Sequence, residues 1–248
     1  MTSRSDLPAS ADPGAAAPDA EALWLGPERA SRRLVLLHGW GADADDLLDL
    51  GRELVNGLEA GDSVTAVPGS GGTPDGSAGG EVSVVALRAP WPHPGGFGRQ
   101  WYDLQRPEWP ELPEARTRLR ARLLALAGSV PLEATALLGF SQGGAMALDV
   151  GCGDEAGAEG LPLAALVSCS GYPHPGWRPR RPRPAVLLTH GEQDPVVPYA
   201  ACEAITSQLQ AVGGKVRRIG FRGGHGIEPS LFPAIVEALR EGWDGGPG

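Results

Sequence analysis

Short apolar segments alternate with longer amphipathic ones along most of the chain. The run of Leu and Val within residues 33–38 stops at Gly39, as expected for a buried strand. Similar apolar runs recur downstream. The predicted strands cover residues 33–38, 82–87, 134–140, 163–168, 185–189 and 215–221.

Segments with apolar residues at three- and four-residue spacing lie between these strands. In the first, Leu47, Leu50, Leu54 and Leu58 follow this spacing and acidic residues gather near the N-terminal end, which indicates an amphipathic helix. Strands alternating with helices predict an α/β fold, with a mostly parallel central sheet and helices on both faces. The predicted helices cover residues 43–56, 113–127, 143–150, 199–212 and 230–241.

We expect one domain and two segments outside its core. Residues 1–20 have few large apolar side chains and cannot bury enough surface to offset the entropy of ordering, which predicts a disordered tail. Residues 57–80 are dominated by Gly, Ser, Thr, Pro and Asp, which predicts a flexible surface insertion. No internal repeat or clean linker divides residues 21–248, which therefore form a single predicted domain.

Charge and cysteine content argue against several classes of partner and site. The net charge of −9 disfavours nucleic acid and anionic membrane surfaces as partners. Cys152, Cys169 and Cys202 are odd in number and lack CxxC spacing, which argues against a disulfide framework and a zinc site. The N-terminus lacks the apolar core of a signal peptide, and no segment approaches the ~20 apolar residues of a membrane helix. We therefore expect a cytoplasmic protein without stable membrane insertion, and its oligomeric state is open.

The clearest chemical signal is a serine flanked by glycines. The segment Gly139-Phe140-Ser141-Gln142-Gly143 has the pattern G-x-S-x-G, follows a predicted strand and opens a predicted helix. In this context the pattern presents a nucleophilic serine on a sharp, strained turn. The glycines keep the crowded backbone free of side-chain clashes. Ser141 is therefore a predicted nucleophile, and a solvent-facing serine at a Gly-rich helix start is the alternative.

A serine nucleophile needs a base, and the base needs an orienting acid. His225 is the preferred base, because it lies in a Gly-rich loop after the last predicted strand. His190 ends a strand and is more consistent with a structural role, and His174 lies in a Pro-rich loop. Asp194 is the preferred acid, because the Pro and Val residues after it anchor its loop, and nearby Glu192 is the alternative.

Acyl transfer also needs donors for the negative charge that develops on the carbonyl oxygen. One is expected to be the backbone amide of Gln142, directly after the nucleophile. The other is expected to be the amide of Trp40, which lies between two glycines in the loop after the first strand. Aromatic residues also gather in residues 91–109, where they line an apolar acyl pocket or contribute to core packing. The predicted substrate-binding residues are Trp91, Phe97 and Trp101.

The chain contains four motifs: LHGWGAD at 37–43, GFSQGG at 139–144, HGEQDPVVP at 190–198 and GHGI at 224–227. Together they resemble the phospholipase/carboxylesterase family, which includes the acyl-protein thioesterases. The stretch of Ala89-Pro90 and the later WYDL at residues 101–104 also resembles the substrate-side loop of that family. The resemblance covers about residues 33–240, and the motifs follow the expected order.

The resemblance implies an α/β-hydrolase fold, a triad of Ser141, Asp194 and His225, and an oxyanion hole formed by the amides of Trp40 and Gln142. It implies a serine hydrolase that cleaves carboxylic esters or acyl thioesters of a small-molecule or acylated substrate through an acyl-enzyme intermediate. No metal or organic cofactor is expected. An acyltransferase, a peptidase on the same fold and a non-catalytic binding protein on a hydrolase scaffold are the alternatives.

Overall fold

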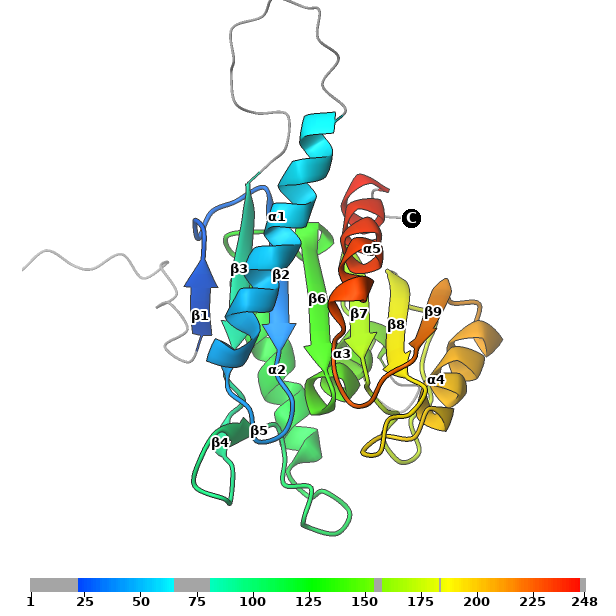
Figure 1. The fold of residues 1–248 in the computed structure, drawn as a ribbon. Coiled ribbons are helices and arrows are strands. Elements are labelled where there is room, and N and C mark those ends of the chain that lie inside the picture. The colour runs from blue at the N-terminus through cyan, green and yellow to red at the C-terminus, as the bar shows by residue number, and fades with distance from the viewer. Residues whose placement is uncertain (1–21, 65–80, 154–157, 183, 246–248) are drawn as a thin grey trace, which may run out of the picture.

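The computed structural model describes residues 22–64, 81–153, 158–182 and 184–245 (Figure 1). Within these ranges one seven-stranded sheet has the order β1-β3-β2-β6-β7-β8-β9. Neighbouring strands are parallel except for β1, which is antiparallel to β3, so the predicted α/β fold with a mostly parallel sheet is confirmed. The strands are β1 (Ala22–Leu25), β2 (Arg32–Leu37), β3 (Val82–Leu87), β6 (Thr135–Phe140), β7 (Ala165–Cys169), β8 (Ala185–Gly191) and β9 (Val216–Phe221).

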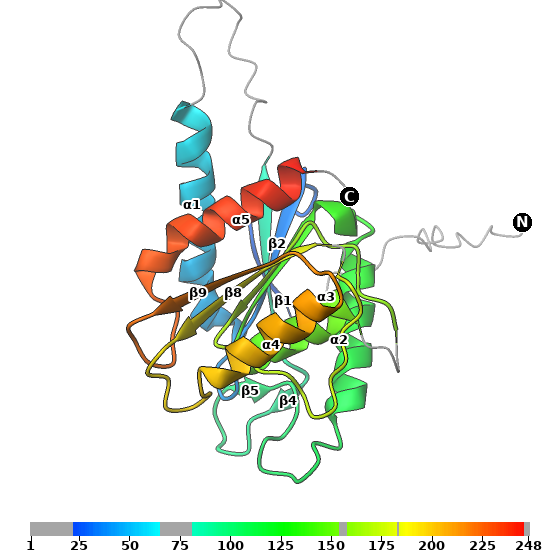
Figure 2. The ribbon, with the colours of Figure 1, turned by 90° about the vertical axis from the view of Figure 1, so that its right-hand side faces the viewer.

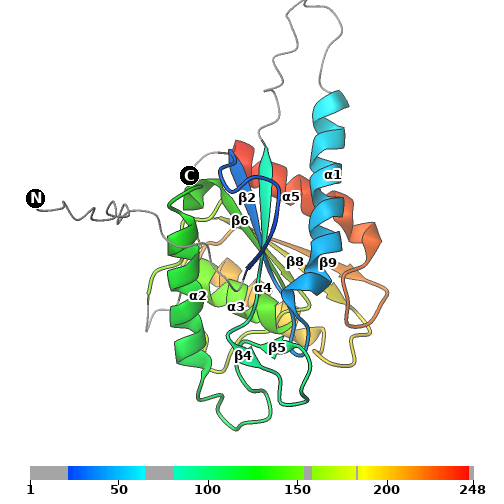
Figure 3. The same ribbon diagram turned by 90° about the vertical axis from the view of Figure 1, so that its left-hand side faces the viewer.

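Helices cover both faces of this sheet (Figures 2 and 3). One face carries α1 (Leu48–Val64) and α5 (Phe232–Asp244). The other face carries α2 (Leu112–Leu126), α3 (Gln142–Cys152) and α4 (Ala200–Ala211). Short 3-10 helices precede α1, β6 and α5, at Ala44–Leu47, Leu132–Ala134 and Pro229–Leu231. In the described ranges, no helix combines the length and apolar character needed to cross a membrane.

Alternate side chains of the central strands enter two separate cores. In β2, Leu34 and Leu36 pack on the face covered by α1 and α5. Val35 and Leu37 pack on the face covered by α2, α3 and α4. A strand covered on both faces needs apolar residues at successive positions, because neighbouring side chains point to opposite sides. This requirement explains why the central strands are uninterrupted apolar runs in the sequence.

Helix α1 extends beyond its predicted end. The sequence predicts a helix over 43–56 and a flexible insertion from residue 57, but α1 continues to Val64. A Cβ atom at Gly57 would lie 2.9 Å from Cγ2 of Val236 in α5, so this glycine permits two helices to pack closely and does not begin a loop. The prediction for residues 57–64 is therefore wrong. Residues 65–80 and the predicted tail at 1–20 lie outside the described ranges.

The apolar pattern also misses three short strands. β1 has four residues at the edge of the sheet, all half-buried. β4 (Trp91–Pro92) and β5 (Arg99–Gln100) form a separate antiparallel ribbon. Strands of this length are too short to show a diagnostic alternation. The other predicted helices and strands are confirmed, with their ends displaced by at most three residues.

Arg33 is a fully buried charged residue in β2. Its Nη1 donates to the carbonyl of Leu126 at 2.6 Å, and its Nη2 donates to the carbonyl of Glu28 at 2.6 Å. The same side chain donates to the hydroxyls of Ser83 (3.2 Å) and Ser129 (2.9 Å). The guanidinium therefore ties together the segment before β2, the end of α2 and the start of β3.

Replacing Arg33 with Met should lower the free energy of unfolding by roughly 3 kcal/mol, because buried carbonyl groups lose their donors at about 1–3 kcal/mol each. The adjacent Arg32→Met is the matched control. Arg32 forms a partly exposed ion pair with Asp244 at 2.9 Å, and its loss should cost less than about 1 kcal/mol. Urea unfolding of both variants measures the difference, and equal losses would contradict the role assigned to the buried guanidinium.

Candidate active site

The predicted site residues converge on the carboxyl edge of the sheet. Because parallel strands end at one edge, the loops that follow them lie close together. Ser141 follows β6, Asp194 lies in the loop after β8, and His225 lies in the loop after β9. Residues 38–41 follow β2, which pairs with β6. The sheet order therefore brings four separate sequence segments to one place.

Ser141 occupies a strained turn between β6 and α3. Its φ of 53° and ψ of −117° lie in a region that is costly for a residue with a side chain. The N–H of Ser141 donates to the carbonyl of Cys169 at 2.8 Å, which fixes the turn. A Cβ atom at Gly139 would overlap the carbonyl of Gly143, and one at Gly143 would overlap the carbonyl of Leu37. Both glycines are therefore required by close backbone contacts.

His225 lies between Ser141 and Asp194. Its Nε2 is 2.9 Å from Oγ of Ser141, and its Nδ1 is 2.7 Å from Oδ2 of Asp194. An ionised carboxylate only accepts hydrogen bonds, so the proton lies on Nδ1 and Nε2 of the neutral ring accepts from the serine hydroxyl. The ring of Phe140 packs against the imidazole, with centroids 4.9 Å apart. This geometry allows the imidazole to remove the proton of the serine hydroxyl.

The Asp194 carboxylate is buried and held by its own loop. Its side chain is fully buried, and Oδ1 accepts from the N–H groups of Val196 (2.8 Å) and Val197 (2.9 Å). Burial acts to raise the pKa of Asp194, but the hydrogen bonds from His225 and from the two amides outweigh it and lower the pKa below its ordinary value. Glu192, the alternative acid, is exposed.

The other two histidines after the nucleophile do not contact the Ser141 hydroxyl in the described structure. His190 is buried, with Nε2 2.8 Å from the carbonyl oxygen of Val197 and 3.4 Å from Oδ2 of Asp194. Nδ1 of His174 lies 2.7 Å from Oδ2 of Asp149. This second Asp–His pair has no signal in the sequence, because its members are far apart in the chain and neither lies in a recognisable motif. His225 is the histidine that faces the Ser141 hydroxyl.

Gln142 and Trp40 are both anchored to residues 100–102. Gln142 begins α3, and the first N–H groups of a helix have no carbonyl partner within that helix. Its side chain accepts from the N–H of Trp101 at 2.9 Å and donates to the carbonyl of Tyr102 at 2.8 Å. The indole N–H of Trp40 donates to the side chain of Gln100 at 2.8 Å. One short segment therefore fixes both residues whose backbone amides are the predicted oxyanion donors.

His38 supports the loop after β2. Its imidazole is buried, its Nδ1–H donates to the carbonyl of Gly39 at 2.7 Å, and its Nε2 accepts from the N–H of Ala89 at 3.1 Å. Burial lowers the pKa of His38, which keeps the imidazole neutral and Nε2 available as an acceptor. The carbonyl of His38 accepts from the indole N–H of Trp101 at 2.9 Å. This side chain therefore holds the shape of the loop that carries Trp40.

The three aromatic residues predicted to bind substrate differ in exposure. Trp101 is 1% exposed and belongs to the core, whereas Phe97 is 70% exposed between β4 and β5. Trp91 is half-buried, with the guanidinium of Arg118 5.4 Å from its ring centroid. Contact with substrate stays a prediction for all three. Phe97 is the one whose ring is open to a ligand.

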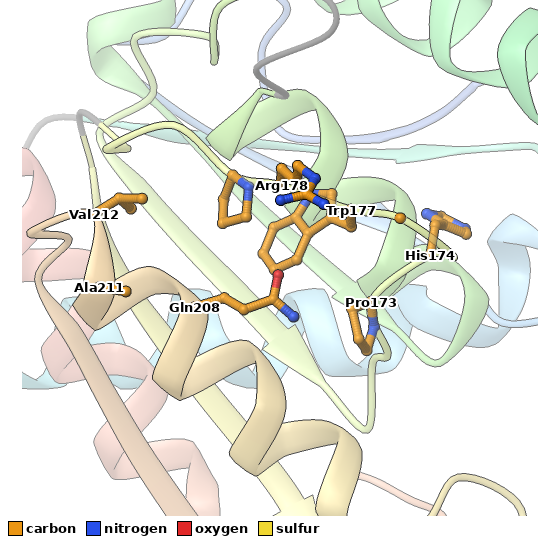
Figure 4. A pocket seen from close by; sticks show the side chains of 9 residues that line it. Pro173, His174, Trp177, Arg178, Gln208, Ala211 and Val212 are labelled. Carbon is orange, nitrogen blue, oxygen red and sulfur yellow. The ribbon is translucent and has the colours of Figure 1, made fainter.

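A cavity of about 480 Å³ lies between the loop at residues 173–179 and α4 (Figure 4). Trp177 and Gln208 face each other across it. Its lining does not include the Ser141 site, so the cavity does not mark the position of the serine. Across the described part of the chain, no group of three or more His, Cys, Asp or Glu side chains is placed to hold a metal ion.

Comparison with known families identifies the chain. A family model described as phospholipase/carboxylesterase matches residues 90–241. The chain belongs to the phospholipase/carboxylesterase family. The matched region contains Ser141, Asp194 and His225, and the membership confirms the resemblance inferred from the sequence motifs. It places the protein among hydrolases of the α/β-hydrolase fold.

Solved structures of an esterase, a carboxylesterase and a phospholipase/carboxylesterase share this fold. Esterase PE8 is 27% identical, with 89% of this chain and 98% of that chain aligned at a TM-score of 0.68. A Bacillus cereus carboxylesterase is 18% identical, with 90% and 96% coverage and a TM-score of 0.68. A phospholipase/carboxylesterase from Dyadobacter fermentans is 16% identical, with 88% and 95% coverage and a TM-score of 0.62. A comparison with curated proteins finds no match.

In this phospholipase/carboxylesterase family member, Gly143→Ala should lower the free energy of unfolding by about 3 kcal/mol, because the new methyl group meets backbone atoms that cannot move independently. Gly151→Ala in the same helix is the matched control. Its Cβ would meet the end of the flexible Leu166 side chain, and alanine favours the helix, so the change should stay within about 1 kcal/mol. Chemical denaturation tests both, and equal effects would refute the proposed backbone constraint.

The lowered pKa of Asp194 predicts an acid-dependent stability term. The unfolded carboxyl group binds its proton near its ordinary pKa of 3.8, whereas the folded group binds it only at lower pH. The stabilisation is therefore complete above pH of about 4 and is lost as the pH falls through the folded pKa. The difference in unfolding free energy between wild type and Asp194→Asn should shrink below pH of about 4. Asp45→Asn, at an exposed carboxylate, controls for the loss of one negative charge. A pH-independent difference for Asp194→Asn would contradict the assignment.

Proposed function

We propose that the protein is a serine hydrolase that cleaves carboxylic esters or acyl thioesters with a Ser141–His225–Asp194 triad. The observation that carries this proposal is the continuous contact from Oγ of Ser141 to the imidazole at 2.9 Å and from the imidazole to the carboxylate at 2.7 Å. Membership of a hydrolase family and likeness to esterase PE8 support the same reaction class.

The reaction proceeds through an acyl-enzyme. Oγ of Ser141 attacks the acyl carbon while Nε2 of His225 takes the hydroxyl proton, and the carbonyl oxygen becomes an oxyanion. His225 then gives this proton to the departing alkoxide or thiolate as its bond to the acyl carbon breaks. Water enters, loses a proton to His225 and attacks the acyl-enzyme, and the proton returns to Ser141 as the carboxylic acid leaves. Asp194 keeps the imidazole oriented and stabilises its protonated form.

The backbone amides of Gln142 and Trp40 are the proposed oxyanion donors. Gln142 directly follows the nucleophile and opens α3, so both its free N–H and the positive end of the helix dipole favour negative charge there. Trp40 lies in the loop after β2, and Gly143 of the same helix turn packs against the carbonyl of Leu37 at the end of that strand. This packing supports a donor on each side of the developing charge.

The proposed substrate is a small-molecule or acylated compound with an apolar acyl group. Exposed Phe97 between β4 and β5 offers an aromatic surface to such a group, and half-buried Trp91 lies on the same ribbon. Trp101 directly follows β5 and is buried in the core. We also propose a cytoplasmic location, which is supported by the three free, buried thiols of the described chain.

Ser141→Ala should lower kcat/KM for p-nitrophenyl esters by about three orders of magnitude or more, because the variant lacks the nucleophile and keeps only binding and oxyanion stabilisation. Activity of the wild type is measured across acyl chains from acetyl to palmitoyl, and with acyl thioesters. Ser207→Ala is the control, since Ser207 is an exposed residue of α4 whose hydroxyl donates to the carbonyl of Glu203 in the same helix. It should retain wild-type activity.

The outcomes separate the proposed reaction from its alternatives. Retention of activity in Ser141→Ala would refute the triad. A covalent fluorophosphonate adduct on Ser141 without turnover of any ester or thioester would refute the proposed substrate class while leaving the nucleophile in place. Formation of a new ester on addition of an alcohol acceptor, at the expense of the free acid, would favour an acyltransferase.

A further inference from the structure

A second Asp–His pair is connected through Tyr102 to the side chain of Gln142. Oδ2 of Asp149 in α3 is 2.7 Å from Nδ1 of His174, which lies in the loop after β7. Nε2 of His174 is 2.8 Å from the hydroxyl oxygen of Tyr102. The His174 side chain is fully buried and that of Asp149 is 6% exposed. We call Asp149, His174 and Tyr102 the Asp149 relay. Its order of acid, imidazole and hydroxyl is the same as in the Ser141 site.

Tyr102 cannot act as a second nucleophile. Its residue is fully buried, so no substrate reaches the hydroxyl. Burial also raises the pKa of Tyr102, which keeps the phenol protonated. The protonated hydroxyl can donate to His174, and its oxygen can accept from the hydroxyl of Tyr172 at 2.5 Å. The Asp149 relay accordingly fixes the position of Tyr102.

Further contacts hold the acid end of the relay. Nε of Arg116 in α2 donates to Oδ2 of Asp149 at 2.5 Å, so this oxygen lies between the guanidinium and the imidazole of His174. The ring of Trp109 packs beside the relay, with its centroid 5.2 Å from that of Tyr102 and 5.7 Å from that of His174. The relay therefore joins α2, α3 and two loops in one buried network.

The backbone beside Tyr102 connects this network to the proposed oxyanion donors. The carbonyl of Tyr102 accepts from Nε2 of Gln142, and the N–H of Trp101 donates to Oε1 of the same side chain. The indole N–H of Trp101 donates to the carbonyl of His38, two residues before Trp40. Residues 101–102 therefore touch both segments that carry an oxyanion donor.

We propose that His174 is a positioning residue for the oxyanion hole. Through Tyr102, the Asp149 relay aligns the backbone amides of Gln142 and Trp40. Helix α3 carries Gln142 at its start and Asp149 further along, so residues 101–102 are attached to one rigid helix at two separate points. Oxyanion donors act over a narrow distance of about 2.7–3.1 Å, so a small displacement weakens transition-state binding more than substrate binding. This inference rests on the proposed function.

The test separates positioning from simple stabilisation. Tyr102→Phe removes only the hydroxyl of the relay and should lower kcat for p-nitrophenyl esters about tenfold, with KM changed less than about twofold. His174→Ala should have the same effect. His174→Gln, whose amide can again bond to the Tyr102 hydroxyl, should recover part of the lost kcat.

Thr135→Val is the matched control for losing a buried hydroxyl. Thr135 is 1% exposed, and its hydroxyl donates to the carbonyl of Pro131 at 2.9 Å, at the opposite end of β6 from Ser141. It should lower thermal stability as Tyr102→Phe does, but leave kcat unchanged. If Tyr102→Phe also loses stability while keeping its kcat, the relay is only structural and the proposal is overturned.

A double-mutant cycle tests the route of the effect. Gln142→Ala keeps the backbone amide but removes the side chain that holds residues 101–102. If the relay acts through this side chain, Tyr102→Phe should lower kcat much less in the Gln142→Ala background than in wild type. If the double variant shows the full product of the two single-variant losses in kcat, the inference is overturned. Full activity of Ser141→Ala would refute the proposed function, whereas an inactive Ser141→Ala with a fully active Tyr102→Phe would refute the positioning role alone.

Discussion

The architecture of the site depends on how closely the first turn of α3 approaches the ends of β2 and β6. The backbone of Gly143 lies against the carbonyl of Leu37, and that of Gly139 lies against the carbonyl of Gly143, with no space for a side chain at either position. This approach places the helix N-terminus beneath Ser141 and forces the serine into a positive φ. The strained conformation of Ser141 persists because the flanking strand β6 and helix α3 are buried and packed in place.

Two acid–imidazole pairs in the described structure show how burial separates support from reactivity. The His225 side chain is 17% exposed and faces a hydroxyl at the surface of the site. The His174 side chain is fully buried and faces a phenol that is itself inaccessible. The same arrangement of groups therefore suits proton transfer in one case and mechanical support in the other. What differs is whether a substrate and water can reach the hydroxyl.

Sequence patterns predicted the parts of the structure that depend on contacts between residues close together in the chain. The strand–Ser141–helix turn was predictable because its glycines are adjacent in sequence to the serine they accommodate. The extension of α1 was not, since Gly57 serves a contact with Val236 that is distant in the chain. Likewise, Trp101 lies among Gly and Pro residues typical of the surface, yet hydrogen bonds to Gln142 and His38 hold it in the core. Such contacts follow from the tertiary fold, which no short pattern contains.

The spacing along α3 has a consequence for how members of such a fold can diversify. Gln142 and Asp149 are separated by about two helical turns, roughly 10 Å along the axis, and point in nearly the same direction. Gln142 and Asp149 of this helix contact two loops, at residues 101–102 and 172–174 respectively. Substitutions elsewhere in either loop therefore leave its attachment to the helix, and the position of the nucleophile at the start of that helix, unchanged.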